Sequence, residues 1–154
     1  MTEGPWLDEE QQRLWRSWLA VSSGLPTLLN RELQQKTGLS LPDFDVLVQL
    51  SEAQDSRMRV TTLAQALGWE KSRTSHHLTR MARRGLIQRA ECADDGRGAF
   101  VELTQDGRQA IESAAPDHAR HVRDLFFTDL TVDEFDVMQR ALSKLQGRVR
   151  PPAA

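Results

Sequence analysis

Basic and polar side chains are concentrated between Trp69 and Arg89. This segment has a local charge of +5, whereas the whole chain of 154 residues has a net charge of −2. The basic residues are Lys71, Arg73, Arg80, Arg83, Arg84 and Arg89, and the acidic residue is Glu70. Because each neutralised phosphate releases condensed counterions, such a patch favours binding to a nucleic acid. The net charge excludes a globally basic coat protein, so we expect any such binding to come from this segment.

The residues that follow Glu70 have the period of a helix with two different faces. At about 100° per residue, one face is predicted to pack and the other to be polar and basic. The first face collects Thr74, Leu78, Met81 and Gly85, and the second collects Ser72, Arg73, His76, Thr79, Arg80 and Arg83. A solvated face without a ligand is the alternative interpretation of such a helix.

Two neighbouring elements favour a binding function for this helix. Before it, Thr61 is predicted to cap a short helix that ends at Gly68. After it, the runs 86–92 and 99–103 flank the Gly-rich tip 94–98, which predicts a β-hairpin. Helix, short turn, basic helix and hairpin are the order of a winged helix-turn-helix, whose second helix enters the major groove of DNA.

Amphipathic helices are also predicted before this motif. Apolar residues at steps of three and four predict a long helix that ends at Gly38, with a kink or break near Gly24 and Pro26. A shorter helix is predicted after Ser40, with an apolar face toward the core. The polar stretch 51–59 is predicted to be a loop with room for a short strand.

Two more helices are predicted after the hairpin. Thr104 is predicted to cap the first, which is disturbed at Pro116 and continues to about Phe127. Thr131 and Glu134 have the spacing of a capping box and open the second. The outermost helices carry apolar stripes at Leu14, Trp18, Val21, Leu25 and Leu28, and at Phe135, Met138, Leu142, Leu145 and Val149. A small winged helix cannot cover this much apolar surface, so we expect a homodimer, with packing within one chain as the alternative.

Several sequence patterns in this region occur together in one protein family. They are residues 63–68 (LAQALG), residues 71–81 (KSRTSHHLTRM), residues 84–89 (RGLIQR), and the wing pattern Asp95-Gly96-Arg97 followed by Leu103-Thr104 and Gly107. On these residues the chain resembles the multiple-antibiotic-resistance regulator (MarR) family of winged-helix repressors. The long helices outside residues 60–111 match the arrangement in this family, so the resemblance spans nearly the whole chain.

The resemblance implies a mainly α fold with a small β-hairpin wing, a winged helix-turn-helix whose N- and C-terminal helices form a dimerisation domain. Residues 1–39 and 105–150 would form the helical dimerisation region, residues 40–104 the DNA-binding lobe, and residues 151–154 a disordered tail. The implied function is a ligand-responsive transcriptional repressor that binds a pseudo-palindromic operator in double-stranded DNA as a homodimer, with half-sites about 10 base pairs apart. A winged-helix interaction or architectural module without specific DNA recognition is the alternative.

Roles in DNA binding follow from the positions of residues on the predicted helix. Ser72 and Arg73 lie at its amino end, where they are expected to meet base edges, and arginine is suited to bidentate pairing with guanine. His76 lies one turn further along the same face. Ser75 borders this face and could serve either a base or a phosphate, whereas His77 points partly toward the core and is predicted to pack.

Phosphate and minor-groove contacts are expected from other residues. Arg80 and Arg83 are expected to hold phosphates that set the register of the protein on DNA. In related proteins the wing arginine, which is Arg97 in this chain, reaches the minor groove, whose narrow A·T-rich stretches attract its charge. Asp95 is expected to hold the hairpin or to orient Arg97.

The resemblance further implies a small aromatic or phenolic ligand, bound where the dimerisation helices meet the winged lobes. Trp15, Trp18 and Phe44 are candidate walls of its pocket, and plain core or dimer interface is the alternative for these residues. The ligand would stabilise a lobe spacing that no longer matches the operator, which is allostery by differential binding.

Other reactive side chains do not combine into a site. His118 and His121 stand three residues apart, but no nearby cysteine or acidic trio completes a metal-binding set, so surface histidines are favoured. Cys92 is the single cysteine of the chain, which excludes an internal disulfide framework, and it is expected to be an inert structural thiol. We expect no metal and no cofactor.

An enzyme and a membrane protein are both disfavoured. The neighbours Ser75 and His76 point about 100° apart on a helix, so they cannot act as nucleophile and base. The chain has no Gly-x-Ser-x-Gly motif, phosphate loop or dinucleotide fingerprint. No apolar run approaches the ~18 residues of a membrane helix, and the first ten residues are acidic rather than basic. A cytoplasmic location is therefore expected.

Overall fold

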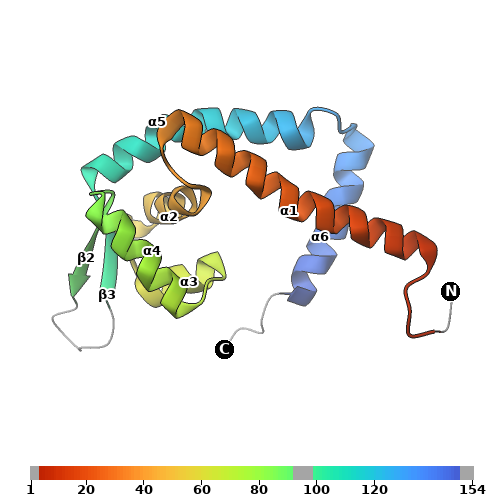
Figure 1. The fold of residues 1–154 in the computed structure, drawn as a ribbon, viewed down its shortest axis with the longest axis horizontal. Helices are drawn as coiled ribbons and strands as arrows, with labels where there is room; N and C mark the ends of the chain where they lie inside the picture. Colours follow the sequence, from red (N-terminus) through yellow and green to blue (C-terminus); the bar gives the residue numbers. More distant parts are fainter. Residues whose placement is uncertain (1–3, 92–98, 150–154) are drawn as a thin grey trace. The chain divides into compact units, whose positions relative to one another are not determined.

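The computed structural model describes residues 4–91 and 99–149 of the chain. The helices are α1 (Glu9–Thr37), α2 (Leu41–Glu52), α3 (Val60–Leu67), α4 (Lys71–Arg83), α5 (Gln105–Val122) and α6 (Val132–Val149), with a 3₁₀ turn η1 (Gln54–Ser56) and a π-helical turn η2 (Arg123–Phe127) (Figure 1). The strands are β1 (Arg57–Arg59), β2 (Ile87–Glu91) and β3 (Ala99–Leu103). This mainly helical fold with a small sheet confirms the predicted fold class. Its compact units are Met1–His118 and Ala119–Ala154, which are described separately.

Helix α1 is longer and more continuous than the sequence predicts. Asp8 caps it, because its carboxylate accepts from the Gln11 N–H at 2.8 Å while the Gln11 side chain accepts from the Asp8 N–H at 3.1 Å. Gly38, with φ of 72°, ends it in the left-handed conformation, as predicted. The predicted break at Pro26 is wrong, since α1 is helical on both sides of this residue. Proline removes only one backbone donor, and the many remaining bonds of a 29-residue helix outweigh that loss.

Two other local predictions are also wrong. Helix α5 passes through Pro116 without interruption, and the departure from α-helical geometry comes later, at η2. Thr61 does not cap α3, because it lies inside the first turn and Arg59 occupies the cap position without a side-chain bond. Strand β1 ends at Arg59 and α3 begins at the next residue, so no residues remain between them to form a separate capping turn.

The predicted hairpin is present and belongs to a three-stranded antiparallel sheet. Strand β3 lies in the centre, with β2 on one side and β1 on the other. The register places Arg89 opposite Val101, and Phe100 opposite both Ala90 and Arg59. The tip of the wing, which includes Cys92, Asp95 and Arg97, lies outside the described residues.

One hydrophobic core holds α4 in place. Its members are Leu33, Leu39, Phe44, Val46, Leu47, Leu50, Leu63, Leu78, Met81, Leu86, Ile87, Val101, Ile111 and Ala114. Helix α4 packs beside α3 and β2 (Figure 1). Thr74, Leu78 and Met81 are completely buried, which confirms the predicted packing face of α4. Gly85 lies beyond the end of α4, where its φ of 75° turns the chain toward β2.

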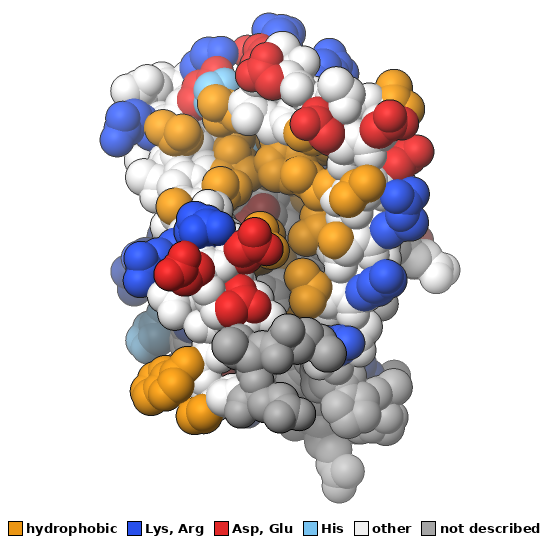
Figure 2. Space-filling view, turned by 90° about the vertical axis from the view of Figure 1, so that its right-hand side faces the viewer, with side chains coloured by type: hydrophobic (Ala, Val, Ile, Leu, Met, Phe, Trp, Pro, Cys, Tyr) orange, Lys and Arg blue, Asp and Glu red, His pale blue; other side chains and the backbone are white. Residues whose placement is uncertain are grey.

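The C-terminal unit contains apolar side chains that one chain leaves exposed. Thr131 and Glu134 form the predicted capping box at the start of α6, with their reciprocal bonds at 2.9 and 3.3 Å. No residue of α6 is buried. Phe135 is 43% exposed and Leu145 is 51% exposed. Exposed hydrophobic side chains are visible as orange patches in Figure 2. Within the described residues, no helix combines the length and apolar character needed to cross a bilayer.

The close contact of α5 with the chain before β2 depends on Gly107. A Cβ at this position would overlap the Leu86 carbonyl oxygen and would lie 2.8 Å from Leu103 Cδ1. We expect Gly107→Ala to lower the free energy of unfolding by about 3 kcal/mol, because a backbone group cannot move aside as a side chain can. Urea denaturation at fixed protein concentration measures this.

Gly24→Ala is the matched control. Nothing lies within 4 Å of a Cβ built at Gly24, which is inside α1. This substitution is expected to raise stability by up to about 1 kcal/mol through helix propensity. Equal effects of the two substitutions would contradict the close approach at Gly107.

Candidate nucleic-acid interface

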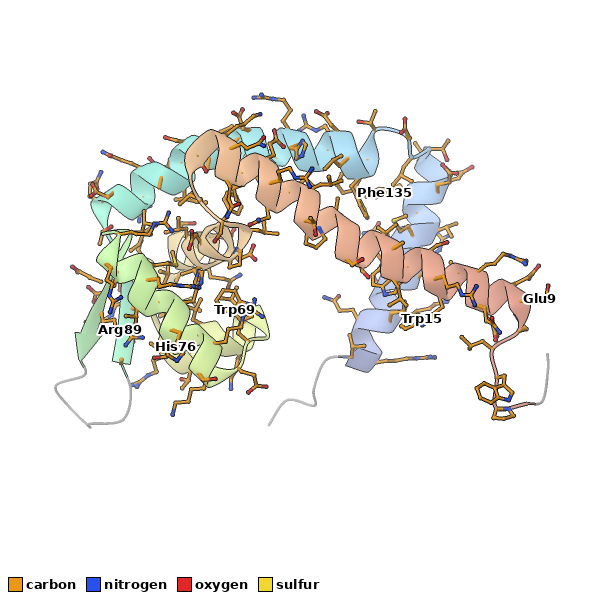
Figure 3. The ribbon with its side chains drawn as sticks, viewed as in Figure 1. Glu9, Trp15, Trp69, His76, Arg89 and Phe135 are labelled. Atoms are coloured by element: carbon orange, nitrogen blue, oxygen red, sulfur yellow. The ribbon has the colours of Figure 1, made fainter. Side chains whose placement is uncertain are left out.

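The outward face of α4 presents a set of basic and polar side chains to solvent. Ser72, Arg73, His76 and Arg80 are exposed, whereas Ser75 is half-buried at the edge of the face. Lys71 and Arg83 are exposed on the same helix. The structure therefore brings five of the six predicted site residues onto one helix, and the sixth, Arg97, lies outside the described residues. Figure 3 shows Trp69, His76 and Arg89 around α4.

Arg73 is held over an aromatic ring at the amino end of α4. Its guanidinium carbon lies 4.7 Å from the centre of the Trp69 ring, a distance at which a cation is attracted to the ring face. Trp69 belongs to the turn between α3 and α4, and its N–H donates to the Ala64 carbonyl oxygen at 2.9 Å. The turn that ends α3 thus also orients the first arginine of the basic face.

Arg89 links the wing to α4. It points to the same side of the sheet as the buried Val101 opposite it. Its guanidinium donates to the Ser75 carbonyl oxygen at 3.0 Å and to the Ser75 hydroxyl oxygen at 3.2 Å. From the sequence, Arg89 is predicted only to add a positive charge to the basic segment. The structure shows that it also orients the Ser75 side chain, a contact that no sequence spacing indicates.

His77 lies on the buried side of α4, which confirms that it packs. It is 7% exposed, and its Nδ1 lies 3.0 Å from Nη2 of Arg80. Its Nε2 lies 3.0 Å from Oδ1 of Asp43 on α2. No described group has aligned hydrogen-bond geometry with Nε2, so this second contact is mainly electrostatic.

Asp43 is a buried carboxylate with several donors around it. Oδ2 accepts from Arg84 Nη1 at 2.6 Å and from the Ser40 N–H at 2.9 Å. Burial would raise the pKa of Asp43, but His77, the Ser40 N–H and Arg84 hold the pKa of this carboxyl well below its usual range. Arg84 also donates to the Gly38 carbonyl oxygen at 3.1 Å. Arg84, which the sequence counts in the basic patch, therefore connects α4 to α2 instead of facing a ligand.

A second pair of arginines lies on the outer face of the sheet. The guanidinium groups of Arg57 and Arg59 lie 4.2 and 4.8 Å from the centre of the Phe100 ring. Arg57 also pairs with Glu102 at 3.5 Å. Arg57 and Arg59 are not among the residues that the sequence predicts to bind, although their alternation about Met58 is the strand period that could have placed them on one face.

Of the remaining candidate residues, two pack against each other and two are exposed on α1. The His118 ring contacts the Phe44 ring with ring centres 4.2 Å apart and an angle of 41° between the planes, and Phe44 belongs to the core. Trp15 is 52% exposed and Trp18 is 45% exposed on α1. Across residues 4–91 and 99–149, no group of three or more histidine, cysteine or acidic side chains is arranged to hold a metal ion.

Comparisons of the sequence and of the structure with known proteins all point to one family. Residues 37–98 match the model of the MarR family. The structure of AbsC, a MarR family transcriptional regulator from Streptomyces coelicolor, is 35% identical, with 96% of this chain and 99% of AbsC covered at a TM-score of 0.88. Sco3205, a MarR family transcriptional regulator from the same organism, was solved in complex with DNA. It is 31% identical, with 98% of this chain and 95% of Sco3205 covered at a TM-score of 0.91.

A curated relative matches over a shorter region. The HTH-type transcriptional repressor YetL of Bacillus subtilis (strain 168) is 33% identical over 81 residues, which is 53% of this chain and 48% of YetL. The match thus spans about half the length of this relative.

The charge of Asp43 is expected to stabilise the fold in a pH-dependent way. Asp43→Asn should lower the free energy of unfolding by about 2 kcal/mol at neutral pH, since Arg84 and His77 lose a buried partner. Because folding lowers the pKa of Asp43, its contribution is complete above the unfolded pKa of about 3.9 and is lost as pH falls below that value.

The difference between the wild type and Asp43→Asn should therefore shrink as pH decreases from 6 to about 3. Urea denaturation across this range measures it. Glu112→Gln, at an exposed position of α5, is the control. A difference that stays constant with pH would contradict the assignment of the charge.

Proposed function

This chain belongs to the MarR family of transcriptional regulators, and on that premise we propose that it binds a pseudo-palindromic operator as a homodimer and represses the adjacent promoter. The family consists of transcriptional regulators, so the chain is a regulator and not an enzyme. The observation that carries the proposal is the likeness to Sco3205, which extends over 98% of this chain at a TM-score of 0.91. That relative was solved with DNA bound.

The chemistry of α4 supports sequence-specific recognition by this chain itself. We assign base-edge contacts to Ser72, Arg73 and His76, because they are exposed toward the amino end of the helix. Arg80 is assigned to a phosphate, since it lies two turns further along the same face. Ser75 serves a base or a phosphate beside them. Arg97 is assigned to the minor groove on the strength of the family pattern alone.

The proposed dimer uses the two ends of the chain. We assign residues 1–39 and 105–150 to dimerisation and residues 40–104 to DNA binding, and the predicted tail, residues 151–154, lies outside the described residues. In support of this, α1 buries only Leu33 among its 29 residues, and α6 buries none. A second copy would cover the same apolar surface on both chains, as a two-fold axis requires.

A small aromatic ligand is the proposed inducer. It would act by binding more tightly to the dimer conformation whose two lobes have one spacing than to the conformation with the other spacing. Trp15 and Trp18 have exposed ring surface that such a ligand could cover, whereas Phe44 is already covered by the core. The proposed location is the cytoplasm.

The proposal is tested by selecting bound fragments from a random or genomic DNA pool and titrating the selected fragment against scrambled DNA at two salt concentrations. We expect a palindromic fragment that binds at least ~10³-fold more tightly than scrambled DNA. Equal and steeply salt-dependent binding to both sequences would indicate a patch that binds phosphates without recognising the sequence. Absence of binding would favour the protein-interaction module.

Arg80→Gln is expected to weaken operator binding and to reduce its salt dependence. If Arg80 neutralises one phosphate, the slope of log K against log salt should become less negative by about 0.9. Fluorescence anisotropy over a range of salt concentrations measures the slope. Lys144→Gln, an exposed cation on α6, should leave the slope unchanged. An unchanged slope for Arg80→Gln would remove Arg80 from the interface.

The dimer is expected to have a mass near twice the 17.5 kDa of one chain by light scattering. The double substitution Leu142→Glu and Leu145→Glu should give a monomer, because it places charges on the exposed apolar stripe of α6. Lys144→Glu changes charge on the same helix outside that stripe and should keep the dimer mass. A wild-type monomer at micromolar concentration would refute this architecture.

A further inference from the structure

We infer that His77 is a positioning residue for DNA binding, which holds the Arg80 guanidinium in the orientation that DNA meets. This inference rests on the proposed function. His77 itself is buried and therefore acts through Arg80 rather than by touching DNA. Its place in the fold differs from that of an ordinary core residue, since its ring contacts the core on one side and an exposed arginine on the other.

The hydrogen-bond chemistry of the ring defines which nitrogen carries the proton. An arginine guanidinium can only donate, so the 3.0 Å contact with Arg80 requires His77 Nδ1 to be the acceptor. The proton of the neutral imidazole is then on Nε2, which faces the Asp43 carboxylate at 3.0 Å. The negative charge of Asp43 favours a proton on the ring nitrogen that faces it, and therefore favours the tautomer that accepts from Arg80.

The ring is itself well held. Asp43 is 3% exposed and has bonds to Arg84 and to the Ser40 N–H on its other oxygen, so it cannot follow a displaced ring. Trp69 meets the ring edge-on, with ring centres 5.3 Å apart and an angle of 81° between the planes. Because both contacts come from elements other than α4, the ring orientation depends on the assembled lobe.

The consequence for DNA binding is preorganisation. One guanidinium N–H group of Arg80 is committed to His77, and its other N–H groups remain available to a phosphate. A side chain that is already oriented loses less rotamer freedom when it binds. The same ring supports Trp69, over which Arg73 lies, so His77 also contributes indirectly to the position of the second arginine.

A double-mutant cycle between His77 and Arg80 tests the inference, with the selected operator fragment as the probe. Glutamine can place its amide nitrogen near the position of Nε2, so His77→Gln keeps the donor toward Asp43 and removes the acceptor for Arg80. We expect His77→Gln to weaken operator binding about fivefold, the effect of one lost hydrogen bond. In the Arg80→Gln background the same change should have less than a twofold effect.

Arg83 provides the matched control, because it is an exposed arginine of the same helix and the structure describes no contact between it and His77. The effects of His77→Gln and Arg83→Gln should multiply. His77→Asn is the rescue variant, since its side-chain oxygen lies near the position of Nδ1 and can accept from Arg80. It should recover most of the lost affinity even where its unfolding temperature is lower than that of His77→Gln.

The outcomes separate a positioning role from a structural one. Multiplicative effects in both cycles, or affinity that follows unfolding temperature across the His77 variants, would overturn the inference while the proposed function stands. Failure of the wild type to prefer the selected fragment over scrambled DNA would overturn both. Nitrogen-15 spectra of the wild-type imidazole provide a readout that needs no His77 variant. We expect a protonated Nε2 and a bare Nδ1 that shifts in Arg80→Gln, and a protonated Nδ1 would overturn the inference.

Discussion

The buried carboxylate of Asp43 is the interaction on which the arrangement of the DNA-binding lobe depends. A charge with 3% exposure is costly unless polar groups compensate it. Here Ser40 at the start of α2 and Arg84 at the end of α4 donate to Asp43, and His77 in the middle of α4 makes an electrostatic contact with it. Apolar packing alone would allow α4 to slide or rotate slightly against α2. The hydrogen bond between Asp43 and Arg84 and the electrostatic contact between Asp43 and His77 restrict such movement, so this carboxylate helps to set the position of the helix that presents the basic face.

Three side chains of the basic face are each oriented by a different residue of the lobe. Trp69 in the turn before α4 supports Arg73, His77 within α4 supports Arg80, and Arg89 on the wing strand supports Ser75. A surface with this construction is more than a solvated helix face, because each side chain loses freedom in the free protein and not only upon binding. It also explains why a chain with a net charge of −2 can bind a polyanion, since the oriented charges are local.

The helices near the two ends of the chain expose apolar surface. Helices α1 and α6 leave tryptophan, leucine and phenylalanine side chains in contact with water. Burial of this apolar surface would lower the free energy of the protein. Symmetric association removes the surface from both chains at once. For a regulator of a pseudo-palindromic site, the same association would give two basic faces related by a two-fold axis, so dimer formation and operator symmetry would have one origin.

The sequence by itself determined the features that depend on near neighbours in the chain. Helical periodicity, the capping residues Thr131 and Glu134, the terminating glycines Gly38 and Gly68, and the hairpin are all local, and the buried and exposed faces of α4 follow from its period. Local rules failed where the surroundings outweigh them, as at Pro26, Pro116 and Thr61. Only the tertiary structure decided which charges pair. Arg84 and Asp43 are 41 residues apart and Arg89 and Ser75 are 14 apart, and sequence spacing cannot show which of several arginines turns inward. The reason is physical, since such a contact forms only where packing brings the two groups within reach of each other, and that position is a property of the whole folded lobe.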